Sequence, residues 1–469
     1  MIFISVYYIM VHKNGLFIFR RDLRIQDNIG LYEASKQCQN LYLTFYFTPE
    51  QVLKNSYKSN NAIQFMIESL EELEQDIRQY GGELIILLEN HQKIIPMLHK
   101  KLELDAVFFN KDVSPYSAFR DNLIIEYCKK QNIVCESFQD YYLYDLANIQ
   151  TTTKKAFQKY TPFYNQVLHH TVSKPSRKSL KNIIKPKIKL TYEYNLLKAR
   201  RTLITENPEI LVHGGRINGL KRLKKALGNQ REYDVKRNYL HYDTSFLSSY
   251  IKFGCISVRE VYHSVKAKYG IKHGMISELI WREFFAHVLY HYPEVLRGSY
   301  YYKNVQWRKS NSDFKKWCKG KTGFPVVDAG MRQMNATGFM HNRSRMMAAT
   351  LLIKVLLLDW RLGERYFAQM LTDYDPASNN GNWQAISGTG VDMKPYFRTM
   401  SPWIQTKKFD PECIYLKRWI PELKDVPPKD IHTWNESWKN YPGVYIEPIA
   451  DFTERTQEMM KMYKKAGSR

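Results

Sequence analysis

The stretch AIQFMIESLEELEQDIRQYGGELIILLE (Ala62–Glu89) sets two structural periods side by side. Apolar residues first recur at the spacing of one helix face, at Ile63, Ile67, Leu70, Leu73 and Ile77. The pair Gly81-Gly82 then ends the helical pattern. The following ELIILLE is almost continuously apolar, which is typical of a strand buried on both faces of a parallel sheet. This stretch therefore predicts a helix followed by a buried strand.

Four apolar runs of this kind, including ELIILLE itself, occur in the first third of the chain. They are GLFIF (Gly15–Phe19), LYLTFYF (Leu41–Phe47), ELIILLE (Glu83–Glu89) and AVFFN (Ala106–Asn110). Because helical patterns separate them, we expect an α/β domain with a doubly wound, Rossmann-like parallel sheet over residues 1–145. Neither G-x-G-x-x-G nor a Walker P-loop occurs, so the sequence marks no phosphate site on the sheet.

The rest of the chain changes character twice. Residues 146–205 are rich in Lys, Thr, Ser and isolated Pro, as in KPSRKSLKNIIKPKIK (Lys174–Lys189), and are expected to form a basic connector. From residue 206 to residue 469 the patterns are helical, most clearly in SELIWREFFAHVLYHYPEV (Ser277–Val295). We therefore expect an all-α C-terminal domain.

Charge and cysteine use narrow the class of protein. The 469 residues carry a formal net charge of +24, which favours a polyanionic partner, although a generally basic proteome would give the same charge. The six cysteines are scattered without a C-x-x-C pair, as expected for reduced thiols inside a cell. The apolar opening IFISVYYIMV is too short to span a bilayer and is expected to be an added edge strand or sequence upstream of a second start at Met10. We expect a soluble, intracellular, monomeric protein.

Polar residues that suit a binding site gather between residues 278 and 398. Glu278, Trp281 and Arg282 lie about one helical turn apart. A helix is expected from Pro325 to Gly338 and another from HNRSRMM onward, with Asn342, Arg343, Arg345 and Met346 at its polar start. A structural ion pair of Arg345 with Asp373 or Asp375 explains these charges equally well. His287 and His291 have a metal-ligand spacing but no third ligand, so no metal site is expected.

Long motifs resemble the photolyase/cryptochrome family, from about Gly15 to Leu423. They are FRRDLRIQDN (Phe19–Asn28), WREFF (Trp281–Phe285), KTGFPVVDAGMRQMNATGFMHNRSRM (Lys321–Met346), DWRLGERYF (Asp359–Phe367), NNGNWQ (Asn379–Gln384) and YFRTMSPWIQTKKFD (Tyr396–Asp410). They occur in the family's order and are most like class I photolyases that act on cyclobutane pyrimidine dimers. The resemblance implies an N-terminal α/β domain and a helical domain that holds FAD.

The resemblance also implies how residues around Asp373–Trp383 hold the flavin. Asn379 falls beside flavin N5, where its amide accepts the N5–H of the reduced ring. Arg345 and Asp373 match a pair that flanks the ring, and Asp375 matches a residue near its pyrimidine edge. The diphosphate is expected to face a helix start that offers hydroxyls and amides of Thr244, Ser245, Leu247 and Ser248, with Tyr233 and Arg237 upstream. Trp383, Trp360 and Trp307 match an electron-transfer chain, although tryptophans usually serve core packing.

The function implied is light-driven repair of dimers in double-stranded DNA by excited FADH⁻. Glu278 and Trp281 would contact the flipped-out lesion, with Arg282, Arg343 and Arg398 at phosphates or on the polar rim. Asn342 and Met346 stand where six-four photolyases carry histidines, so a cyclobutane dimer is the expected substrate.

One position departs from the family pattern. Ala385 replaces a second tryptophan beside the lesion, a loss of roughly 1–3 kcal/mol of stacking. We expect another aromatic residue, Trp403, to compensate for it.

Two points stay open at the level of sequence. A blue-light receptor, or a photolyase for another lesion, is the alternative function; the segment after Leu423 is expected to be too short for a cryptochrome extension. An antenna chromophore on the N-terminal domain, a folate or a deazaflavin, is possible but unmarked by any motif.

Overall fold

The computed structural model describes residues 12–176, 180–392 and 395–467. The apolar opening segment, expected to be an edge strand or upstream sequence, lies outside these residues. Among the described residues, no helix is both long enough and apolar enough to cross a bilayer.

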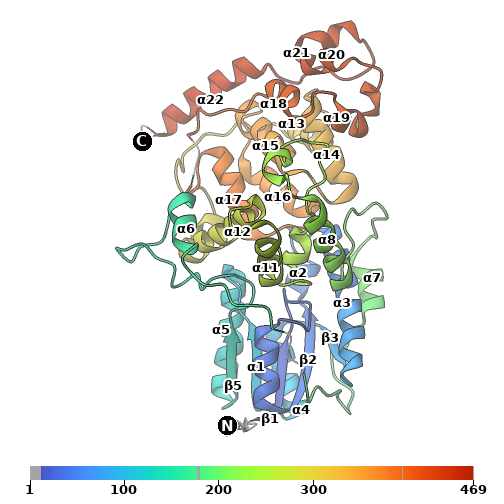
Figure 1. Cartoon of the computed structure of the whole chain (residues 1–469), viewed down its shortest axis with the longest axis vertical. Coiled ribbons are helices and arrows are strands. Elements are labelled where there is room, and N and C mark those ends of the chain that lie inside the picture. The colour runs from blue at the N-terminus through green and yellow to red at the C-terminus, as the bar shows by residue number, and fades with distance from the viewer. Residues whose placement is uncertain (1–11, 177–179, 393–394, 468–469) are drawn as a thin grey trace.

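A parallel sheet forms the lower half of the molecule (Figure 1). Its five strands run in the order β3-β2-β1-β4-β5. Their bounds are β1 His12–Ile18, β2 Cys38–Phe47, β3 Leu84–Leu88, β4 Ala106–Asn110 and β5 Val134–Phe138. The order reverses between β1 and β4, which makes the doubly wound sheet expected from the sequence. The sequence did not predict β5, because this half-exposed edge strand has mixed polarity.

Helices pack on both faces of the sheet. They are α1 Ile29–Gln37, α2 Pro49–Val52, α3 Asn60–Gln79, α4 His91–Leu102 and α5 Pro115–Lys130. Helix α3 confirms the helix predicted from the apolar period of residues 63–77, and Gly81 follows it at φ +77°, a conformation that favours glycine.

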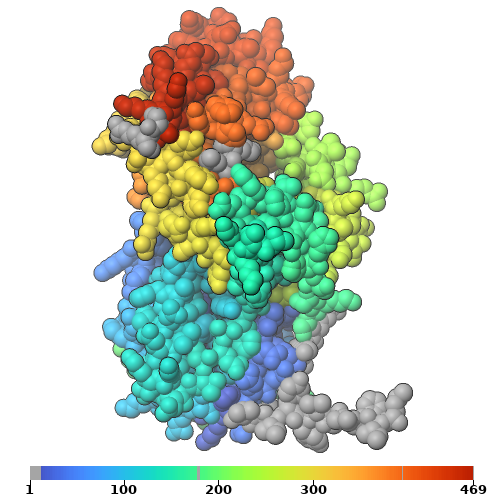
Figure 2. Space-filling view, turned by 90° about the vertical axis from the view of Figure 1, so that its left-hand side faces the viewer, coloured from blue at the N-terminus to red at the C-terminus, as the bar shows by residue number. Residues whose placement is uncertain are grey.

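The basic segment after the sheet is more ordered than its composition indicates. It contains two short helices that the sequence did not predict, α6 Tyr160–Val167 and α7 Leu196–Leu203. Between them the chain returns to the sheet, where Ile183 bridges to Leu41 and Glu193 bridges to Leu87. Figure 2 shows the first part of this segment, in green, lying across the junction between the two halves of the molecule.

The upper half of the molecule is helical (Figure 1). Its α-helices are α8 Arg216–Asn229, α9 Tyr233–Lys236, α10 Ser248–Lys252, α11 Val258–Tyr269, α12 Gly274–His291, α13 Asn311–Cys318, α14 Pro325–Thr337, α15 Asn342–Thr350, α16 Trp360–Met370, α17 Pro376–Ser387, α18 Pro402–Phe409, α19 Ile414–Trp419, α20 Pro428–His432, α21 Trp434–Ser437 and α22 Phe452–Gly467. A π-helical turn, Leu351–Val355, continues α15, and 3₁₀ turns occupy Pro293–Leu296, Pro421–Leu423 and Trp438–Asn440.

Three sequence predictions for this half are confirmed. Helix α12 covers the amphipathic stretch, and α14 begins at Pro325 and ends at Thr337, with Gly338 as its C-cap at φ +69°. Helix α15 begins at Asn342, as expected. His287 is buried and accepts a hydrogen bond from the Phe157 N–H, which fits the structural interpretation of this histidine.

A buried ionic cluster joins the two halves. Arg259 on α11 bonds Asp27 at 3.0 Å and Asp140 at 2.8 Å, while Arg24 bonds Asp140 at 2.7 Å. These four side chains are almost fully buried. Burial alone raises the pKa of Asp140, but Arg24 and Arg259 outweigh it, so the pKa lies below its ordinary value.

The ionic cluster predicts a pH-dependent loss of stability on substitution. Asp140→Asn leaves two buried guanidinium groups short of a counter-charge and should lower the free energy of unfolding by about 3–5 kcal/mol at neutral pH. Because the folded-state pKa of Asp140 is depressed, its contribution exists above the unfolded pKa and is lost as the pH falls through the folded pKa. The difference from the parent should therefore shrink in acid, as measured by urea titration followed by circular dichroism. Asp145→Asn, at an exposed carboxylate, is the matched control. Equal effects of the two substitutions would contradict the role of the cluster.

Candidate functional site

A cavity of about 800 Å³ lies within the helical half. Every residue predicted to bind cofactor lines it: Tyr233, Arg237, Thr244, Ser245, Leu247, Ser248, Arg345, Asp373, Asp375 and Asn379. The four predicted catalytic residues line it too: Glu278, Trp281, Asn342 and Met346. Residues that lie more than a hundred positions apart in the chain thus meet around one space.

The segment DYDPASNNGNWQAISGTG (Asp373–Gly390) contributes one wall of this cavity as helix α17. Asp375 caps the helix, because its Oδ1 accepts the Ser378 N–H at 2.9 Å, and Pro376 occupies the first turn. Gly381 lets α17 approach α12 closely, since a Cβ there would come within 2.1 Å of the Phe285 ring. Trp383 lies on the buried face and also lines the cavity. The polar composition of the segment therefore reflects one capped helix beside a cavity.

Asn379 is held in one orientation by its neighbours. Its side-chain NH₂ donates to the carbonyl oxygen and to Oε1 of Glu364, both at 3.0 Å. Because both donors are engaged, Oδ1 is the atom that Asn379 offers to a ligand, and it can only accept a hydrogen bond. This orientation matches the expected role of Asn379, in which Oδ1 accepts a hydrogen bond from a ring N–H.

The acidic residues of the segment have different partners. Arg345 pairs with Asp373 at 2.9 Å, so one of the two structural ion pairs considered from the sequence forms. Asp375 pairs instead with Arg21 of the N-terminal half, at 2.7 Å. The Oδ1 of Asp373 is buried and has no hydrogen-bond partner within residues 12–176, 180–392 and 395–467. Such an acceptor suits a ligand that brings its own donor.

The lesion residues expected from the sequence occupy the same cavity from α12 and α15. Glu278 forms an ion pair with Arg237, which places Arg237 beside a predicted lesion residue as well as in the predicted diphosphate region. Burial raises the pKa of Glu278, and Arg237 opposes that shift. Asn342 begins α15, and Met346 follows about one turn later on the same wall.

The three arginines predicted to contact DNA differ in their exposure and in the hydrogen bonds that their guanidinium groups already make. Arg282 lines the cavity, but its guanidinium donates to Glu283 Oε1 and to the Tyr141 carbonyl, each at 2.7 Å. Arg343 binds Gln405 Oε1 at 2.7 Å and also bonds Asn238. Arg398 is exposed and lines an adjoining cavity of about 550 Å³. Of the three, Arg398 is the most accessible to a phosphate.

Ala385 lines both the main cavity and the adjoining one. The expectation that Trp403 compensates for the missing tryptophan is wrong. Trp403 stacks on Phe324, with ring centroids 5.1 Å apart, and packs against the helical core. Ala385, Ile386 and Met346 contribute aliphatic side chains to the lining of the main cavity.

Two of the three predicted electron-transfer tryptophans, Trp383 and Trp360, are buried, and Trp307 is half-buried. Trp383 lines the cavity and packs against Gly363, about one turn beyond Trp360 on α16. Trp360 is buried, with its Nε1–H donating to Ser299 Oγ at 3.1 Å. Trp307 is half-buried and meets Tyr463 edge-on, with centroids 6.0 Å apart. Trp383 also touches the buried Trp317 ring, at 6.2 Å, a contact that the sequence analysis missed.

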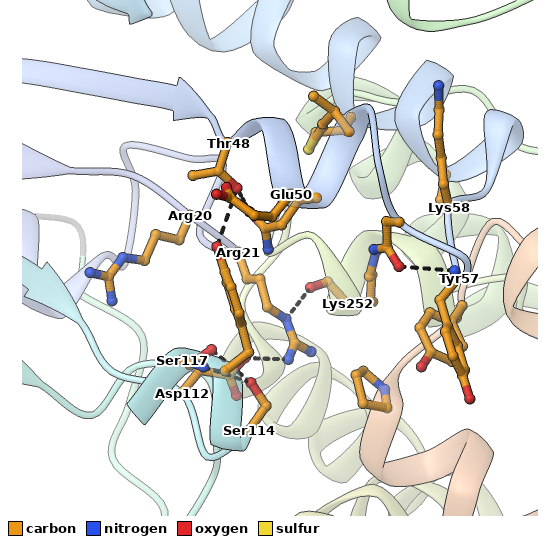
Figure 3. Close-up of a pocket in the computed structure, with 18 of the residues that line it drawn as sticks. Arg20, Arg21, Thr48, Glu50, Tyr57, Lys58, Asp112, Ser114, Ser117 and Lys252 are labelled. Carbon is orange, nitrogen blue, oxygen red and sulfur yellow. Dashed lines mark hydrogen bonds and ion pairs between the residues drawn. The ribbon is translucent and has the colours of Figure 1, made fainter. Parts of the chain in front are cut away.

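A further cavity, of about 600 Å³, opens at the carboxyl ends of the parallel strands (Figure 3). Such an edge, where the strand order reverses, is the usual ligand position in a doubly wound sheet. Its lining combines charged side chains with nine aromatic residues: Phe19, Phe45, Tyr46, Phe47, Tyr57, Tyr116, Tyr141, Phe253 and Tyr374. The sequence carried no motif for this cavity, because its residues come from loops after separate strands and from the helical half.

The two large cavities share part of their walls. Lys252 and Tyr374 line both, and Arg21 connects them by bonding Asp112 at 2.8 Å on one side and Asp375 on the other. Burial, together with Arg21, lowers the pKa of Lys252 to about 7. Ligands in the two cavities would therefore be separated by a single layer of side chains. Metal-ligand clusters of three or more His, Cys, Asp or Glu side chains are absent from the part of the chain that the structure describes.

Comparison with known proteins gives a consistent family. The DNA photolyase family matches residues 16–180, and the FAD binding domain of DNA photolyase matches residues 275–465. The chain is 32% identical over 466 residues to the deoxyribodipyrimidine photo-lyase of Synechococcus sp., with 96% of each chain covered.

Solved structures agree with this assignment. One is an archaeal photolyase from Sulfolobus tokodaii, described with two FAD molecules and the implication of a novel light-harvesting cofactor, with a TM-score of 0.87 at 38% identity over 96% of this chain and 100% of that one. A cryptochrome of Synechocystis sp. PCC6803 has a TM-score of 0.87 at 25% identity, over 96% of this chain and 99% of that one. With its fold, its FAD-binding region and its near-full-length relatives in agreement, the chain belongs to the DNA photolyase family.

Proposed function

We propose that the protein repairs cyclobutane pyrimidine dimers in DNA with light, using reduced FAD. The observation that carries this proposal is the single cavity in which flavin-type residues such as Asn379 and lesion-type residues such as Glu278 face the same space. Reduced FAD, if bound and excited by light, would supply the electron that splits the dimer. The side chains supply binding, orientation and exclusion of water.

The residues present suit FAD. Asn379 offers an acceptor, and Arg345 offers a fixed cation beside the unpartnered Asp373 Oδ1. Thr244, Ser245 and Ser248 add hydroxyl groups and backbone amides in the turn that leads into α10. These groups would hold the ring and the diphosphate of FAD, respectively.

DNA would approach from the side of α12 and α15. A dimer is poorly paired, so flipping it into the cavity costs less than flipping a normal base. Trp281 would stack on it, Glu278 would hydrogen-bond its edge, and Arg343 and Arg398 would face phosphates. The net charge of +24 adds affinity that weakens with salt.

A light receptor of the cryptochrome type is the second candidate. The likeness to the Synechocystis cryptochrome and the aliphatic wall at Ala385 favour it. A receptor would undergo flavin photoreduction without splitting dimers, so repair assays separate the two functions.

The aromatic cavity at the sheet edge would hold a second, light-harvesting chromophore. Its aromatic side chains and the Arg21 guanidinium suit a flavin or deazaflavin ring better than a folate. The S. tokodaii photolyase, described with two FAD molecules, supports this choice. The shared wall at Lys252 and Tyr374 would place the two chromophores close enough to exchange excitation.

Trp383→Phe tests the electron-transfer chain. Photoreduction of oxidised FAD in the presence of a thiol should be lost, because phenylalanine is much harder to oxidise than tryptophan, while repair by chemically reduced enzyme should persist. Absorption spectra under blue light measure the first, and loss of dimers measures the second. Trp434→Phe, at a fully buried tryptophan elsewhere, is the control. Equal loss of both activities in Trp383→Phe would refute the chain.

Glu278→Ala should lower the yield of dimer splitting per absorbed photon, because the lesion loses a hydrogen-bond partner worth roughly 1–3 kcal/mol when charged. Bound FAD and its photoreduction should not change. Pre-reduced enzyme under near-UV light gives the yield, and Glu294→Ala, at an exposed glutamate after α12, is the control. An unchanged yield in Glu278→Ala would favour the receptor.

Ala62→Trp tests the second chromophore site by filling the aromatic cavity from α3. Protein that already holds one FAD is titrated with FMN, FAD and tetrahydrofolate, and binding is followed by fluorescence quenching. The parent should bind a flavin and the variant should not, with the first FAD retained in both. Gln75→Trp, on the exposed side of the same helix, should bind like the parent. A parent that binds only the folate, or neither class, would contradict the proposal.

A further inference from the structure

The ring of Tyr160 covers one face of Trp281. The two ring centroids lie 3.5 Å apart and the planes differ by 3°, a full face-to-face contact. Aromatic pairs left to themselves prefer offset or edge-to-face arrangements, so other contacts must hold this geometry. Tyr160 belongs to α6 in the basic connector, which Figure 1 places beside α12.

Hydrogen bonds fix Tyr160 at both ends. Its hydroxyl contacts the carbonyl oxygen of Ser277 at 3.0 Å and Ser277 Oγ at 2.8 Å. Ser277 lies on α12 one turn before Trp281, so the phenol is tied to the same helix face as the indole. The Tyr160 N–H donates to Asp392 Oδ2 at 3.2 Å, and Asp392 lines the main cavity. Burial raises the pKa of Tyr160, which keeps the hydroxyl a neutral donor.

The indole of Trp281 borders the main cavity. Within residues 12–176, 180–392 and 395–467, Trp281 lines the main cavity and Tyr160 does not. Phe284 meets the indole edge-on at 5.8 Å, and Phe285 tilts against it at 5.5 Å. Ala385 adds no aromatic ring to the cavity, so stacking in the proposed function relies on Trp281.

We propose that Tyr160 is a positioning residue for DNA recognition: it fixes the plane of Trp281 so that a flipped-out base lesion stacks on the free face of the indole. This inference rests on the proposed function, because it assumes that Trp281 stacks on the lesion. The connector, through α6, thereby contributes to lesion binding without touching the lesion.

The test measures the affinity of FAD-loaded enzyme for an oligonucleotide duplex with one thymine dimer, in the dark, against the undamaged duplex. Tyr160→Leu removes the ring and should weaken dimer binding by at least about threefold, a fraction of the roughly 5- to 150-fold expected for Trp281→Ala. Tyr160→Phe keeps the ring and should retain most of the parent's affinity for the dimer. FAD content and binding to undamaged DNA should stay unchanged in each variant.

A double-mutant cycle separates positioning from general support of the fold. In the Trp281→Ala background, Tyr160→Leu should cost no further affinity, because its effect acts through the indole. Tyr164→Leu, a partly buried tyrosine one turn later on α6, should bind as the parent does.

Each other outcome has a distinct meaning. Loss of affinity in Trp281→Ala but not in Tyr160→Leu would overturn the inference and leave the proposed function intact. An equal cost of Tyr160→Leu in both backgrounds would also overturn it. If Trp281→Ala itself binds the dimer as the parent does, the proposed lesion contact fails. If Tyr160→Leu does not fold, Tyr160→Phe takes its place in the cycle. A Tyr160→Phe variant that keeps the parental FAD content but loses further affinity for the dimer in the Trp281→Ala background would contradict the inference.

Discussion

Two buried arginines and two buried aspartates hold the halves of this protein in register. Arg259 reaches from the helical half to Asp27 and Asp140, and Arg24 completes the charge balance. Buried charges are costly unless each has a partner, so this cluster tolerates little displacement of one half against the other. Both large cavities depend on that register, because Arg21 and Asp375, which bond across the junction, connect their walls.

One wall of the candidate site is a helix whose composition suits ligand binding better than helix formation. Helix α17 carries three asparagines, two serines and a glycine on a segment that ordinary packing would fill with leucine or alanine. Its cap at Asp375 and the close approach at Gly381 keep it helical despite this composition. The polar side chains are then free to face a cavity, and Glu364 orients the most informative of them, Asn379. Local stability and function therefore draw on different residues of the same helix.

In the proposed function, lesion recognition would rest on one aromatic stack, Trp281 on Tyr160. Ala385 lines the same cavity without adding an aromatic ring. A single aromatic ring binds a base well only if its plane is fixed. In the proposed function, helix α6 of the connector would fix that plane through Tyr160. On that proposal, the basic segment before residue 206 would contribute to the site through Tyr160.

The sequence by itself determined the α/β order, the helical second half and most of the residues around the main cavity. It could do so because apolar periods report burial locally, and because long motifs such as NNGNWQ (Asn379–Gln384) resemble a known family. It missed β5, whose polarity is mixed, and the helices α6 and α7, which are too short to show a period. Only the tertiary structure decided that Trp403 turns into the core, that Asp375 pairs with Arg21 and that Tyr160 backs Trp281. These contacts join residues far apart in the chain, and no local pattern encodes which distant side chains will meet.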